Sequence, residues 1–115
     1  MSANTYPIFF NSAYLDSTNG TIYTAPASPS TITVQDLQLK ITNTTTATHT
    51  VTIYVVASGG TATSALAVAV NMSVPPNDYI LIPVPRFGAG ATLQGFADTA
   101  DALNVQAVGG KTHTP

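Results

Sequence analysis

The chain has no cysteine and no glutamate among its 115 residues, and it has few charges of either sign. Without cysteine there is no disulfide framework, no thiol nucleophile and no cysteine-based zinc site. Charged residues make up 7% of the chain, against about 25% in ordinary soluble domains. Three basic residues and a net charge of -2 leave no cluster that would bind phosphates, so we expect no nucleic-acid partner.

Long apolar runs are also missing. The longest nearly apolar segment, residues 65–74, is interrupted by Asn71 and Ser73 and is far shorter than the about 20 residues of a membrane-spanning helix. Residues 1–15 have no basic start and no apolar run of signal-peptide length. We therefore expect a protein that is made in the cytoplasm and does not associate with a membrane.

At 115 residues the chain is expected to form a single domain, 1–115, which buries roughly two thirds of its unfolded surface. Its surface must consist mainly of Thr, Ser, Asn, Gln and Ala, so little mutual repulsion opposes association. We interpret this as a sign of assembly, with a sparingly charged monomer as the alternative. Residues 1–5 and 109–115 have little to bury, and we expect a mobile N-terminal arm and a mobile C-terminal tail.

What the chain does contain is alternation with a period of two. Apolar and polar side chains alternate in residues 34–42 and again in residues 51–56, with a Thr-rich polar stretch, residues 43–48, between them. This period is typical of strands that bury one face. The pattern predicts a long antiparallel hairpin whose hydrophobic side is covered by the rest of the chain.

Turn signals rich in Pro, Gly and Asn separate further short segments of strand character. For residues 64–72 a helix competes, since Ala and Leu form helices well, but unbroken alternation and missing caps favour a strand. The apolar run at residues 79–82 is typical of a fully buried strand. About eight strands predict an all-β fold, a single antiparallel β-sandwich with Greek-key or jelly-roll-like order. Besides the hairpin, the expected strands are Tyr6–Phe10, Thr21–Thr24, Ser64–Met72, Tyr79–Ile82, Ala91–Ala97 and Leu103–Val108.

Residues with catalytic or metal-binding chemistry are scarce. His49 opens a strand and His113 lies in the expected tail, and neither has a surrounding motif that would supply a nucleophile and an orienting acid. Asp98 and Asp101 lack the alternating oxygen ligands of a calcium loop, so we interpret them as turn-forming residues. We predict no catalytic residue, no cofactor and no metal site.

Five aromatic residues gather in the first fifth of the chain. They are Tyr6, Phe9, Phe10, Tyr14 and Tyr23. Aromatic rings supply large contact areas, and packing in a core or at an interface is their usual role. We name these five as possible interface residues, with a sugar-stacking platform as the less common alternative.

Residues 37–108 carry a resemblance to a known family. The segments that carry it are LKITNTTTATHTVTIYVV, GGTATSALAV, the PPND turn into YILI, and GAGATLQGFADTADALNVQAVG. Together they resemble a family of small all-β virion structural proteins of tailed bacteriophages, with head decoration or cement proteins among them. The closing GGKTHTP departs from the more apolar end of the family pattern.

The resemblance implies a non-enzymatic virion protein made in the host cytoplasm. It implies in particular a capsid decoration or cement protein bound to the lattice of the major capsid protein, as a homo-oligomer, trimer or dimer. The alternative is a phage tail or fibre component that binds host glycan or another tail subunit. A non-viral carbohydrate-binding or adhesin module is a third hypothesis, which the missing secretion signal weakens.

Overall fold

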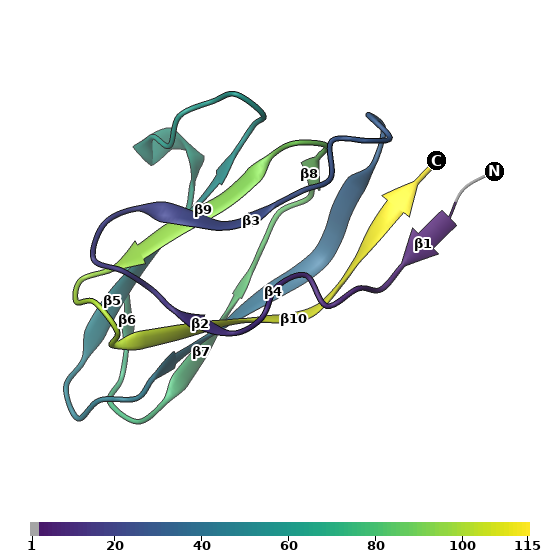
Figure 1. The fold of residues 1–115 in the computed structure, drawn as a ribbon. Helices are drawn as coiled ribbons and strands as arrows, with labels where there is room; N and C mark the ends of the chain where they lie inside the picture. The colour runs from purple at the N-terminus through teal and green to yellow at the C-terminus, as the bar shows by residue number, and fades with distance from the viewer. Residues whose placement is uncertain (1–2) are drawn as a thin grey trace.

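The computed structural model describes residues 3–115, which form two antiparallel β-sheets packed face to face (Figure 1). The strands are β1 (Ala3–Thr5), β2 (Ala13–Tyr14), β3 (Gly20–Thr24), β4 (Thr33–Asn43), β5 (His49–Val56), β6 (Ala67–Val74), β7 (Tyr79–Pro83), β8 (Phe87–Gly88), β9 (Thr92–Ala97) and β10 (Leu103–Thr114), with one 3-10 turn, η1 (Ser64–Leu66). The all-β class predicted from the alternation is confirmed.

The strand order is that of a jelly roll. Sheet A runs β1–β10–β4–β7, with β2 also paired to β10 and β8 to β4, and sheet B runs β3–β9–β5–β6. The pairs β5–β6, β4–β7, β3–β9 and β2–β10 are nested one outside the next along the chain. Eight strands in two sheets with this nesting confirm the predicted jelly-roll-like sandwich.

The core lies between the two sheets and comes mainly from the alternating residues. Leu39 and Ile41 of β4 and Val51 and Ile53 of β5 are all fully buried in one apolar cluster. Each such side chain contributes roughly 1.5–3 kcal/mol by leaving water. The intervening polar residues of β4 point to the other side of sheet A.

The predicted hairpin of β4 and β5 is wrong. β4 pairs with β10 and β7 in sheet A, whereas β5 pairs with β6 and β9 in sheet B, so the two strands face each other across the core. Residues 44–48 therefore cross from one sheet to the other. Alternation determines which face of a strand is buried, but it carries no information about which strand lies beside it.

The two chain ends also differ from the prediction. Residues 109–114 continue β10 and pair with β4 and β1, so the expected C-terminal tail forms sheet up to Thr114. In the expected N-terminal arm, residues 1–2 lie outside the described residues and Ala3–Thr5 form β1. Figure 1 shows β1 beside the C-terminal end of β10. Main-chain pairing forms these strands even though they bury few side chains.

Two strand predictions need correction and the others stand. Residues 6–10 form no strand, and the strands of this region are β1 and β2 on either side of them. The run at residues 79–82 is β7, but it is an edge strand with Tyr79 and Leu81 about half exposed rather than a buried one. The alternating segment that competed with a helix is the strand β6, preceded by η1.

Candidate assembly surface

The five aromatic residues named from the sequence separate into an inner and an outer group. Phe9 is buried in the core, and its ring meets that of Tyr23 edge to face at 5.4 Å between centroids. Phe10 is half-buried and its ring lies 6.3 Å from that of Tyr23. Tyr6 and Tyr14 are exposed, at 73% and 50%. Of the five, these two present most of their rings to a partner in the isolated chain.

Tyr23 connects this inner aromatic group to the second half of the chain. Its ring also lies 6.3 Å from the ring of Phe87, which is buried beside β4. Burial of the phenol raises the pKa of Tyr23 above its ordinary value, because the charged phenolate is poorly solvated there.

The raised pKa of Tyr23 predicts a loss of stability at alkaline pH. The folded state keeps the phenol protonated, whereas the unfolded state ionises near pH 10, so stability falls as pH rises through and beyond about 10. We expect Tyr23→Phe to lose less stability than the wild type between pH 8 and pH 11. Urea unfolding at both pH values measures this difference. Equal alkaline losses in the two proteins would assign the effect to other groups.

Tyr14 belongs to a row of residues that crosses the outer face of sheet A. It pairs with Asn104 of β10, Asn104 pairs with Thr42 of β4, and Thr42 pairs with Tyr79 of β7. Directly paired residues of neighbouring antiparallel strands point to the same side of a sheet. Two tyrosines therefore stand at the two edges of this face with polar side chains between them.

The next two rows complete what we call the outer face of sheet A. Lys40 lies between Gln106 and Leu81, and its ammonium nitrogen is 4.6 Å from the centre of the Tyr79 ring. This contact has cation–π geometry and keeps the lysine stem flat against the sheet. The members of the face are Tyr14, Asn104, Thr42, Tyr79, Gln106, Lys40, Leu81, Val108, Gln38 and Pro83.

Sequence reasoning missed the β7 side of this face. The run YILI was interpreted as fully buried, although Pro75, Pro76 and Pro83 around it carry a usable signal. Proline donates no ladder hydrogen bond, so prolines at a strand's ends mark an edge strand, which exposes part of its side chains.

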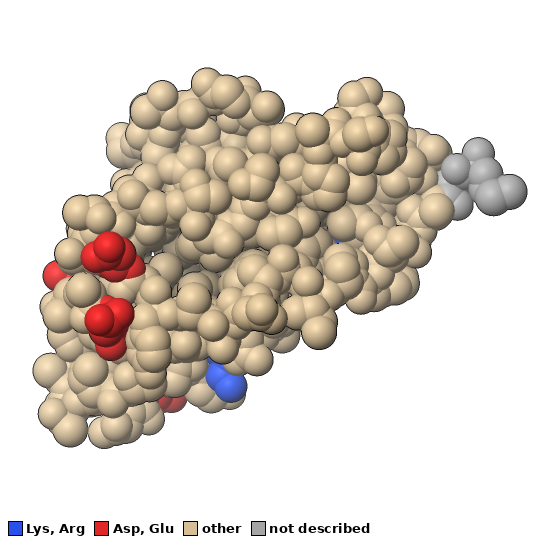
Figure 2. All heavy atoms as spheres, in the orientation of Figure 1, with Lys and Arg blue, Asp and Glu red and all other residues tan. Residues whose placement is uncertain are grey.

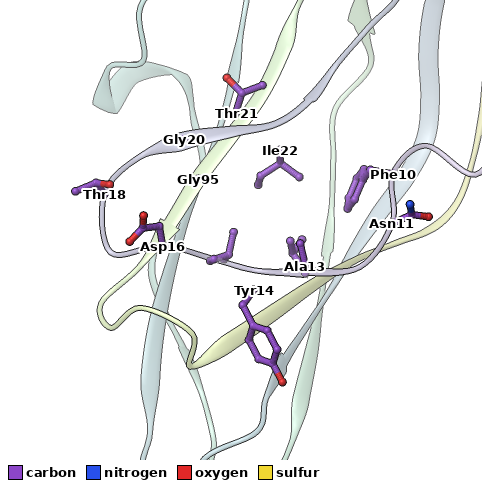
Figure 3. Close-up of a pocket in the computed structure, with 12 residues that line it drawn as sticks. Phe10, Asn11, Ala13, Tyr14, Asp16, Thr18, Gly20, Thr21, Ile22 and Gly95 are labelled. Atoms are coloured by element: carbon purple, nitrogen blue, oxygen red, sulfur yellow. The ribbon is translucent and has the colours of Figure 1, made fainter.

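A hollow opens beside Tyr14, where residues 10–22 cross from sheet A to sheet B. Figure 3 shows Phe10 and Ile22 facing it, while the Tyr14 ring points away. Its volume is about 220 Å³, and Leu15 and Val105 also line it. Sites for drug-sized molecules start near about 300 Å³, so this hollow is sized for a single inserted side chain.

The histidines form surface pairs. His49 Nδ1 lies 2.9 Å from a carboxylate oxygen of Asp98, and His113 Nδ1 lies 2.7 Å from the side-chain oxygen of Asn4. Within residues 3–115 no three His, Cys, Asp or Glu side chains gather in a way that would hold a metal ion. Over the same residues, no helix is long and apolar enough to cross a membrane.

Charged atoms are sparse on the surface. Figure 2 shows acidic groups at one end of the molecule and mostly uncharged atoms over the rest of that face. Lys111 and Asp36 form an ion pair at 3.6 Å with Asp36 largely exposed, a kind of contact worth about 0–1 kcal/mol. The surface therefore offers a partner mainly polar uncharged and apolar groups.

Comparison with solved structures finds a similar fold in proteins of viral particles. A T13 particle of infectious bursal disease virus matches with TM-score 0.61 and 13% identity, covering 97% of this chain and 30% of the other. The Gx strain of that virus matches with TM-score 0.56 and 16% identity, covering 98% and 33%. A D431N mutant VP2 protein in T=1 particles of the same virus matches with TM-score 0.54 and 16% identity, covering 97% and 31%.

These matches show a shared fold and no more, because the identity is low and the chain spans about a third of each neighbour. No protein-family model matches the sequence. No curated protein matches it either.

Proposed function

We propose that this chain is a non-enzymatic structural component of a virus particle. The observation that carries the proposal is the match of nearly the whole chain, 97%, to a subunit of an icosahedral viral particle. Jelly rolls also occur in lectins and cupins, so fold alone does not decide the function. The weakly charged surface with exposed Tyr and Leu side chains adds support, since stable interfaces are depleted of charge and enriched in aromatic residues.

Within the particle we propose the role of a capsid decoration or cement protein of a tailed bacteriophage. The partner is the major capsid protein or a neighbouring virion subunit, and the location is the virion after synthesis in the host cytoplasm. The sequence resemblance over residues 37–108 is the ground for this particular role, and the fold match supports the broader virion role. Mass spectrometry of purified particles tests it through copy number. Many copies per capsid are expected, and a handful or none contradicts decoration.

The outer face of sheet A is the proposed docking surface. It exposes Tyr14, Tyr79 and Leu81 around a single charged residue, Lys40. At about 4.8 Å between strands and about 3.3 Å per residue, the ten residues of the face cover roughly 300 Å². A stable interface buries about 800 Å² per partner, so the face of one copy supplies less than half of that area. Linked copies bind more tightly through avidity, and we propose a homo-oligomer, trimer or dimer, for this reason.

Removing the β7 side chains from this face is expected to abolish most of the binding. We predict that the double variant Tyr79→Ser, Leu81→Ser binds depleted capsids with an affinity lowered by about tenfold or more, because both side chains are about half exposed and supply apolar contact area to a partner. Co-sedimentation of the purified protein with capsids lacking it measures occupancy.

The matched control for this experiment is Val70→Ser, which removes an equally exposed apolar side chain from the edge of the other sheet. It should leave occupancy unchanged. An equal loss from the control variant would place the contact elsewhere or make it non-specific.

A second candidate function is a tail or fibre component that binds host glycan. The exposed rings of Tyr6 and Tyr14 favour it, since sugar rings stack on exposed aromatic faces. The burial of Phe9 and the half-burial of Phe10 and Tyr23 reduce the platform expected from the sequence to two rings. A glycan array separates the two candidates: binding lost in Tyr14→Ala supports the tail role, and silence supports docking on protein.

A further inference from the structure

The N-terminal residues before Phe9 are attached to the body of the molecule mainly through β1. β1 pairs with the last residues of β10, and all three β1 residues are exposed. Residues 6–12 lie in no strand, and the next pairing with the body begins at Ala13. Segments with little burial open locally at low cost in free energy.

Phe9 is the point at which this segment becomes part of the body. Its ring packs directly on Gly110, because a Cβ placed there would lie 2.8 Å from the Phe9 ring. Residues before Phe9 are held by the β1 pairing and by side-chain contacts between Thr5 and Thr112 and between Asn4 and His113. Residues 3–8 therefore form an arm hinged at Phe9.

We propose that this arm exchanges between copies of the chain, so that β1 of one copy pairs with β10 of a second copy. An exchanged arm remakes every contact it gives up, because the end of β10 in the second copy is identical. Six extended residues span about 20 Å, which is long enough to reach a neighbour's sheet end. The inference rests on the homo-oligomer of the proposed function and deepens it by naming the contact between two copies of this chain.

Two side chains favour the exchanged arrangement over the closed one, in which β1 pairs with β10 of its own chain. Tyr6 is 73% exposed and Ile8 is 86% exposed in the closed arm, where each faces water. Both lie between β1 and the hinge, in the stretch that passes from one copy to the other. Where two such stretches cross, these apolar side chains are covered by the other copy, and their removal from water favours exchange.

Two other sheet edges, β7 and β6, are poorly suited to pair with a second copy. β7 is flanked by Pro75 and Pro76 and ends in Pro83, which cannot donate to a ladder. β6 is irregular, with register shifts against β5 and Asn71 at a φ of +46°. The end of β10 at residues 112–114 is regular and is covered by only three residues, so it accepts a strand more readily than β6 or β7.

Disulfide trapping tests the exchange, because the chain has no cysteine of its own. Asn4 and His113 are direct partners in the β1–β10 pairing, a geometry that a disulfide accommodates. Purified Asn4→Cys and His113→Cys single variants are mixed at high concentration and oxidised. Exchange joins the two variants into a covalent heterodimer, seen on a non-reducing gel as dimer formed by the mixture in excess of that formed by either variant alone. The matched control mixes Thr42→Cys with Asn104→Cys, which are partners inside the body of sheet A and should give no heterodimer.

The double variant Asn4→Cys, His113→Cys supplies the second readout. We expect covalent dimers that increase with protein concentration, and about tenfold fewer of them when Ile8→Ser is added, since less apolar surface is covered. Adding Val70→Ser should not change the yield. Two results together would overturn the exchange. The double variant would give only internally crosslinked monomer at every concentration, and the mixed single variants would give no more heterodimer than the control mixture. Those results would leave the virion role to be decided by particle composition.

Discussion

Gly95→Ala is expected to lower the free energy of unfolding by about 2–3 kcal/mol, although it adds one methyl group. Gly95 lies in β9, between β3 and β5, and its backbone is covered from both sides. A Cβ at this position would lie 2.7 Å from Ile53 Cδ1 and 2.8 Å from the main-chain oxygen of Thr52. The isoleucine end can rotate, but the Thr52 oxygen belongs to a paired strand and moves only with the sheet.

Gly20 provides a matched control for this effect because it is the direct partner of Gly95 in the neighbouring strand. A Cβ at Gly20 would meet nothing within 4 Å. Gly20→Ala should therefore leave stability unchanged or raise it by up to about 1 kcal/mol, because alanine restricts the unfolded chain. Urea unfolding followed by circular dichroism measures both variants. Equal changes in the two would show that crowding at Gly95 is not the cause.

Asn43→Asp is expected to lower the free energy of unfolding by about 3–4 kcal/mol at neutral pH. Asn43 is 1% exposed, and its side-chain nitrogen donates to the carbonyl oxygens of Ala47 at 2.7 Å and Val74 at 3.0 Å. Its side-chain oxygen accepts from the main-chain nitrogen and the hydroxyl of Thr45, at 2.9 and 2.8 Å. The substitution puts a carboxylate oxygen against two carbonyl oxygens and removes both donors.

The pH dependence of this variant separates charge from lost packing. The introduced carboxyl is buried among acceptors, so its pKa in the folded state lies above the value of about 3.9 in the unfolded state. The free energy of unfolding that the variant loses relative to wild type should then be smallest below about pH 4, and it should grow as pH rises through the folded-state pKa. Asn19→Asp makes the same change at an exposed residue and should cost less than about 1 kcal/mol. A deficit independent of pH would contradict a buried charge.

Asn43 also shows why the predicted hairpin failed. A polar residue at the end of an alternating strand indicates a loop, and residues 43–48 do connect two strands. The asparagine nevertheless holds that connection to the end of β6, at Val74, so that the chain crosses to sheet B and does not turn back along β4. The partner of this side chain lies 31 residues away, and no local pattern identifies it.

The aromatic residues show the same limit for the candidate surface. Their positions near the N-terminus predict a cluster, and Phe9, Phe10 and Tyr23 do pack together. Which rings remain exposed depends on Gly110, Phe87 and the β2–β10 pairing, all of which come from distant parts of the chain. Tyr79 and Leu81 were missed for the opposite reason, since a run of four apolar residues carries no periodicity that separates an edge strand from a buried one.

The order of polar and apolar residues alone determined the fold class, most strand positions and the buried faces of β4 and β5, because those depend on neighbours two residues apart. Tertiary structure decided the partners of each strand, the rows of the outer face of sheet A and the pairing of both chain ends. These depend on contacts such as Tyr14 with Asn104 and Thr42 with Tyr79, between residues far apart in the chain. Such contacts form only when the two sheets close over one core, so their energies appear in no local stretch of sequence.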